Sequence, residues 1–68
     1  MKLQEYDVVR LLKPVPEHKL QAGSVGAVVG VYTSPTAYEV EFADANGVTI
    51  ALLTLQSDDL EKIDVPAS

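Results

Sequence analysis

The chain has 68 residues with ten acidic and five basic side chains, a formal net charge of −5, and no cysteine. A domain this small buries only about 60% of the surface that its unfolded chain exposes, so there is room for one modest core. The absence of cysteine excludes disulfides and thiolate metal sites, and a single histidine excludes the usual zinc sets. The acidic balance disfavours a phosphate backbone as ligand.

The first seven residues, Met-Lys-Leu-Gln-Glu-Tyr-Asp, carry charges where a signal peptide has an apolar run. No segment reaches the length of a membrane-spanning helix. We therefore expect a cytoplasmic protein that does not bind membranes. Because the sequence has no internal repeat or linker, we expect a single domain over residues 1–68, with its core from about residue 6 to residue 65.

The first predicted strand covers residues 6–12, where Val9 and Leu11 share one face of the alternating pattern. Two prolines follow, and each removes an amide donor and keeps the residue before it extended. Residues 13–21 are therefore expected to form a long first loop over the surface, anchored by Leu20.

The next stretch joins a turn to a bent strand. Gly23 stands where a turn needs a positive φ, and Gly26 stands where the chain must bend or be approached closely. The strand over residues 25–33 is predicted to point its small and branched side chains inward, namely Val25, Ala27, Val29 and Val31. Pro35 then marks a turn.

Residues 37–43 show the clearest period of two, with Tyr38, Val40 and Phe42 on one face and glutamates on the other. The turn residues Asn46 and Gly47 follow. Asn-Gly between two strand-like runs is the strongest short-range hairpin signal, so residues 48–55 are the predicted partner strand.

This partner strand has more apolar residues than one core face needs. We assign Ile50, Leu52 and Thr54 to the core. An exposed apolar strand on a small protein usually marks an interface, and the predicted protein interface consists of Ala51, Leu53 and Leu55, with the surface tyrosines Tyr6 and Tyr32. The alternative is that Val15 and Leu20 of the long first loop fold over this strand.

Ser57, followed by two aspartates, is typical of a helix N-cap, and only about one turn fits before Ile63 and Val65. We therefore predict a 3-10 turn and a short last strand. Five short strands without a helix-length pattern predict an all-β fold, a small five-stranded SH3-like barrel with a long first loop and a 3-10 turn before the last strand.

Four separated blocks carry a family resemblance: residues 7–11, residues 20–29 with their two glycines, residues 38–42 and residues 50–55. On these blocks the chain resembles a small bacterial family, the domain of unknown function 4926, from about Tyr6 to about Leu60. More distantly it resembles the SH3-like barrels of the KOW motif and of the nitrile hydratase beta subunit. The first resemblance implies a stand-alone domain without an established role, similar in size and acidity to antitoxin-like partners. The KOW resemblance implies RNA or ribosome contact, and the nitrile hydratase resemblance implies subunit packing without metal ligands.

The polar residues predict neither catalysis nor metal binding. The acidic residues from Asp58 onward fit a solvated helix start, and turn chemistry accounts for Asp44 and Asn46. His18 and its neighbour Glu17 lie in an exposed loop, without a nucleophile to activate. We therefore expect a non-enzymatic module without cofactor, metal or small-molecule substrate.

Two hypotheses for the function remain. The first is a protein-interaction module that binds a protein partner or a second copy of itself through the apolar strand, in the manner of an antitoxin-like partner. The second is a KOW-like nucleic-acid binder that uses Arg10, Lys13, Lys19 and Lys62. Salt-sensitive RNA binding would support the second hypothesis.

Overall fold

A computed structural model describes residues 2–64 of the protein. The chain forms one antiparallel sheet of five strands, namely β1 (Val8–Leu11), β2 (Val25–Thr33), β3 (Thr36–Ala43), β4 (Thr49–Leu55) and β5 (Leu60–Lys62). Two 3-10 turns are present, η1 (Pro16–His18) in the long first loop and η2 (Ser57–Asp59) before the last strand. The predicted all-β, five-stranded fold is confirmed.

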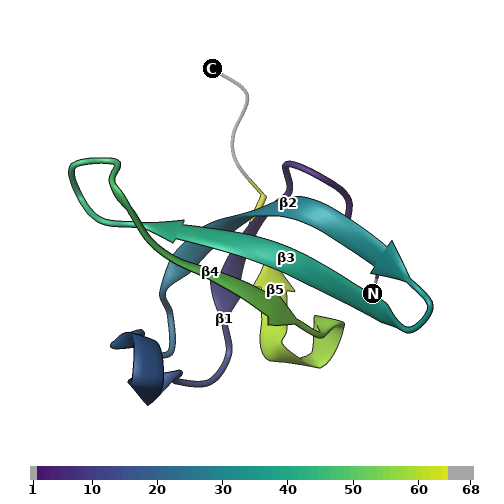
Figure 1. Ribbon diagram of the computed structural model, residues 1–68, viewed down its shortest axis with the longest axis horizontal. Helices are drawn as coiled ribbons and strands as arrows, with labels where there is room; N and C mark the ends of the chain where they lie inside the picture. Colours follow the sequence, from purple (N-terminus) through teal and green to yellow (C-terminus); the bar gives the residue numbers. More distant parts are fainter. Residues whose placement is uncertain (1, 65–68) are drawn as a thin grey trace.

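The strand order is β4-β3-β2-β1-β5, and in the described part of the chain no hydrogen-bonded ladder closes β4 onto β5. β2 is shared by the two halves of the sheet. Its residues 25–27 pair with β1, and it pairs with β3 from Gly26 to Thr33. Figure 1 shows β2 curving from the region of β1 into the long hairpin with β3. This curvature lets one face of the sheet enclose the core.

The core lies on one side of the sheet, which we call the inner face. Directly opposed residues of antiparallel strands share a face. One inner row across four strands alternates small and large side chains, as Val9, Gly26, Phe42 and Ala51. The buried residues are Leu3, Val9, Leu11, Leu20, Val28, Tyr38, Val40, Phe42, Ala51, Leu55 and Leu60. The predicted inward faces of the first and third strands are therefore correct.

Gly26 is closely approached, as the sequence predicts. A Cβ added there would lie 2.7 Å from the backbone oxygen of Glu41 and 2.8 Å from Cδ1 of Phe42. Phe42 is the cross-strand partner of Gly26, and its ring occupies the space that a side chain would need. The glycine thus makes room for the largest side chain in its row.

The predicted turns are also present. Gly23 has a φ of +95° and Gly47 a φ of +80°, values that favour glycine. In the β3–β4 turn, the Asn46 and Val48 amides donate hydrogen bonds to Oδ1 of Asp44, at 2.9 and 3.0 Å. The side chain of Asp44 therefore holds the hairpin loop that the Asn-Gly signal predicts.

The predicted inward face of β2 is wrong for the first part of the strand. Val28 is fully buried, whereas Val25 and Val29 are exposed; Val31, although 41% exposed, lies opposite the buried Tyr38 and so on the inner face, as predicted. Val28 lies directly opposite the buried Val40, which fixes it on the inner face. The pairing with β3 then shifts at a β-bulge in which Val29 is the extra residue, so that a simple alternation along the strand fails.

Several element ends differ from the predictions. Tyr6 has a φ of 74° and lies in a turn, so β1 begins at Val8. The N-cap of η2 is Gln56 rather than Ser57: the Gln56 amide donates a hydrogen bond to Oδ2 of Asp59, and the Gln56 carbonyl accepts one from the Asp59 amide. The last strand ends at Lys62, and the predicted strand residue Val65 lies outside the described residues.

The segment before β1 also contributes to the core, which the sequence pattern did not indicate. Leu3 is 1% exposed, and its amide donates a hydrogen bond to the buried Tyr38 hydroxyl at 3.2 Å. The core therefore begins before residue 6. In the long first loop, Val15 and Leu20 form an isolated bridge and pack into the same core, as the predicted anchor role of Leu20 requires.

Candidate functional site

The predicted interface residues on β4 lie on the opposite face from the one expected. Ala51 and Leu55 are 7% and 9% exposed and belong to the core, and Leu53 is partly buried and packs against it. Ile50 and Leu52, predicted to fill the core, are instead 50% and 53% exposed. The strand does present an apolar surface, but with the other set of side chains.

The pairing of β3 with β4 explains this exchange. Tyr38 lies directly opposite Leu55, and Phe42 lies directly opposite Ala51. Because opposed residues share a face, the inward aromatic side chains of β3 fix Ala51 and Leu55 as inward. The alternative prediction, that loop residues such as Leu20 cover the strand, describes the inner face correctly, since Leu20 belongs to the same core cluster.

The opposite side of β2, β3 and β4 carries several large apolar side chains that remain exposed. Across four strands, one row on this side reads Leu52, Glu41, Ala27 and Val8. Val25 is 52% exposed and Val29 is 37% exposed. We call this surface the outer face, and its residues are Val25, Ala27, Val29, Glu39, Glu41, Ile50 and Leu52.

The outer face reaches one edge of the sheet. β4 is the terminal strand in the order, with β3 as its partner on one side. In residues 2–64 no strand lies on its other side. Edge strands with exposed apolar side chains are the places where sheet proteins pair with or are covered by other chains.

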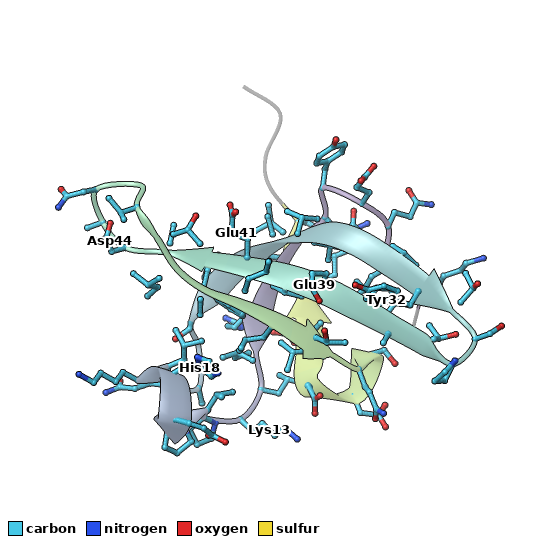
Figure 2. The ribbon with its side chains drawn as sticks, in the orientation of Figure 1. Lys13, His18, Tyr32, Glu39, Glu41 and Asp44 are labelled. Carbon is cyan, nitrogen blue, oxygen red and sulfur yellow. The ribbon has the colours of Figure 1, made fainter. Side chains whose placement is uncertain are left out.

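Two glutamates of β3 project among these apolar residues. Glu39 lies opposite Thr54, whose hydroxyl donates a 2.6 Å hydrogen bond to Oε1 of Glu39. Glu41 lies between Leu52 and Ala27 in its row. Neither carboxylate takes part in an ion pair with another described residue. Figure 2 shows both glutamates along β3, with Asp44 in the loop beyond the end of the strand.

The cations proposed for nucleic-acid contact are mostly paired within the chain. Arg10 pairs with Glu61, Lys13 Nζ lies 2.8 Å from Oδ1 of Asp59, and Lys62 Nζ lies 3.7 Å from Oδ1 of Asp7. Their charges are therefore offset by neighbouring carboxylates. The described surface offers no cluster of free cations of the kind on which phosphate binding depends.

Asp59 links the long first loop to η2. Its carboxylate accepts hydrogen bonds from Lys13 and from the Gln56 amide, the latter at 3.1 Å, and its carbonyl accepts the Leu12 amide at 2.9 Å. The hydrogen bond from Lys13 lowers the pKa of Asp59 below its ordinary 3.8 and raises the pKa of Lys13 above 10.5. The Lys13–Asp59 pair thus holds the start of the long first loop against η2.

A hollow of about 610 Å³ lies between the β2–β3 hairpin, the N-terminal segment and η2. Its lining residues are Lys2, Val31, Tyr32, Thr33, Thr36, Tyr38 and Ser57. Tyr32 borders this hollow and is 51% exposed, whereas Tyr6, 77% exposed, is not among the lining residues. The two tyrosines of the predicted interface are therefore both exposed but do not line the same hollow.

Among residues 2–64, no group of three or more His, Asp or Glu side chains is placed to hold a metal ion. His18 ends η1 in the long first loop, and Figure 2 places it apart from Glu39 and Glu41 on β3. In the same part of the chain, no helix has the length and apolar character needed to cross a membrane.

The comparison with known proteins agrees with the sequence blocks described above. The model of a family described as "Domain of unknown function (DUF4926)" matches residues 5–62, which is most of the chain. Neither a search of curated proteins nor a search of solved structures found a significant match.

Proposed function

The chain belongs to the DUF4926 family, and we propose that it is a non-enzymatic module that binds a protein partner through its outer face. The observation that carries this proposal is the exposure, between 37% and 53%, of Val25, Val29, Ile50 and Leu52 on one side of the sheet. β4 remains the proposed binding strand, but its contact residues are Ile50 and Leu52 instead of the predicted Ala51, Leu53 and Leu55.

Burial of these side chains by a partner would be favourable. Complete burial of a Val, Leu or Ile side chain contributes about 1.5 to 3 kcal/mol. About half of that remains available at Ile50 and Leu52, because each has half of its surface still exposed. The nucleic-acid hypothesis lacks comparable support, since three of its four cations lie in ion pairs.

The proposal is tested by replacing Leu52 with the photo-crosslinking residue p-benzoylphenylalanine and irradiating cells of the native host. We expect a covalent protein adduct that disappears when Ile50→Asp is added to the same chain. The matched control places the crosslinker at Leu12, which is 52% exposed but follows the end of β1, a strand that β2 separates from β3 and β4.

Two results would contradict the proposal. One is the same pattern of adducts from positions 52 and 12, which would indicate random collisions. The other is an adduct at position 52 that persists with Ile50→Asp. Circular dichroism of the Ile50→Asp variant confirms that any loss of the adduct is not a loss of the fold.

A further inference from the structure

We propose that the partner surface covering the outer face is cationic, with an arginine or lysine side chain that pairs with Glu41. This inference rests on the proposed function and specifies the chemistry of the protein partner. It follows from where Glu41 lies among the apolar side chains.

A partner cannot cover the apolar residues of the central row without covering Glu41. Leu52 on β4 and Ala27 on β2 are its direct neighbours on either side. Adjacent strands are about 4.8 Å apart, so only about 10 Å separates the Leu52 and Ala27 backbones, with Glu41 between them. Any flat protein surface that contacts both apolar side chains therefore also removes the Glu41 carboxylate from water.

An ionised carboxylate that is buried without a partner is strongly unfavourable, and a cation with good hydrogen-bond geometry removes most of that cost. Within the described residues Glu41 has no ion pair of its own. Arg10 projects on the same side of β1, but it is already paired with Glu61 of β5. The compensating charge must come from the partner.

Glu39 strengthens the requirement. It lies two residues from Glu41 on the same strand and face, at a backbone separation of roughly 7 Å. Its carboxylate accepts a hydroxyl from Thr54 and is paired with no cation among the described residues. A planar guanidinium that donates several hydrogen bonds suits two such carboxylates. The net charge of −5 also attracts a basic surface before contact.

A second copy of this chain does not meet the requirement. Its outer face would bring another Glu39 and Glu41 against the first pair, and the Arg10 of each copy is already held by Glu61. Like charges placed opposite one another in an interface are unfavourable. We therefore favour a different protein with a basic, partly apolar surface.

The test uses a yeast-displayed library of random sixteen-residue peptides as the probe. Clones are sorted for binding to the wild-type protein and counter-sorted against Leu52→Asp. We expect the remaining clones to combine Arg or Lys with large apolar residues. Glu41→Gln should weaken their binding at least tenfold, the loss typical of one buried charge pair. Glu17→Gln is the control, because it removes the same charge from an exposed residue of η1.

The outcomes separate this inference from the proposed function. Clones that require Leu52 but contain no cation, or that bind Glu41→Gln as well as the wild type, would overturn the inference and leave the protein-binding function standing. Absence of clones, or clones that bind Leu52→Asp equally well, would overturn both. Light scattering across a range of concentrations should show a monomer, and a dimer that Leu52→Asp dissociates would identify a second copy as the partner and overturn the inference.

Discussion

Gly26→Ala adds one methyl group at the most crowded point of the sheet. The new Cβ would lie 2.7 Å from the Glu41 carbonyl oxygen and 2.8 and 2.9 Å from two ring carbons of Phe42. Neither neighbour moves easily, because one is backbone in the β2–β3 ladder and the other is a ring that is 1% exposed. The strand must therefore shift away from its partner or the core must repack.

Overpacking of this kind costs about 1 to 3 kcal/mol. Replacement of glycine by alanine also stabilises the folded state by about 0.4 to 1 kcal/mol, because it reduces the conformational entropy of the unfolded chain. The net expectation for Gly26→Ala is a loss of about 1 to 2 kcal/mol in the free energy of unfolding. Gly26→Val, with two further methyl groups, should cost more.

Urea denaturation followed by circular dichroism measures this difference. For a small domain with a slope near 1 kcal/mol per molar urea, the midpoint should fall by about 1 to 2 M. Gly30→Ala is the matched control in the same strand, since its Cβ would meet only Glu39 Cβ at 3.4 Å, an ordinary contact. We expect it to stay within about 0.5 kcal/mol of the wild type. Equal midpoints for the two variants would refute the assigned role of Gly26.

Leu53→Asp is expected to destabilise the fold by about 2 to 4 kcal/mol because it places a charge against the core, while Leu52→Asp should stay within about 0.5 kcal/mol of the wild type. Equal thermal midpoints for the two variants would contradict the assignment of Leu53 to the inner face and Leu52 to the outer face. Asp59→Asn should reduce stability at about pH 6 by more than at about pH 2.5, because a lowered pKa stabilises the fold above the ordinary 3.8 and this contribution is lost as the pH falls. A urea-midpoint difference that is constant with pH would disprove this linkage. Tyr38→Phe should cost about 1 to 2 kcal/mol, because the buried Leu3 amide loses its acceptor, and faster hydrogen exchange at that amide is the direct check.

The parts of the fold predicted correctly are those that local chemistry determines. The alternation of Tyr38, Val40 and Phe42 correctly predicted β3 and its inward face, because one face of this strand is exposed to solvent and the other is buried. Positive φ at Gly23 and Gly47 follows from the lack of a Cβ. Each of these features depends on neighbours in sequence, and so the sequence contains the whole signal.

Which side chains of β4 point toward the core could also have been predicted from the sequence, although the prediction made was incorrect. An Asn46-Gly47 turn that pairs Ala45 with Val48 would, if continued along the hairpin, pair Phe42 with Ala51; the structure has this pair, although its ladder reaches it from Ala43 and Thr49, with Ile50 as an extra residue. The apolar pattern of β4 is nearly continuous and cannot choose between its faces. The choice comes from the partner strand, and the outer face with Leu52 follows from it.

Other features depend on contacts between distant parts of the chain. The extra residue Val29 in β2 reflects how two paired strands accommodate the bend of the sheet, and no local pattern marks it. Leu3 lies in a charged segment and is buried only because Tyr38 and the core are there to receive it. Glu41 gains its significance from Leu52 and Ala27, which lie on two other strands.

The bulge at Val29 and a second interruption of the pairing, between β3 and β4, determine where the length of this chain can vary. Val29 is an extra residue between the pairs of Val28 and Gly30, and Ile50 is an extra residue between the pairs that end at Thr49 and begin at Ala51. Deletion of either residue leaves every other pair and every inward side chain in place, whereas a deletion elsewhere in a paired strand exchanges its faces. Among relatives, single-residue gaps within strands are therefore expected at these two positions, where they would flatten the sheet and trim the exposed apolar surface without altering the core.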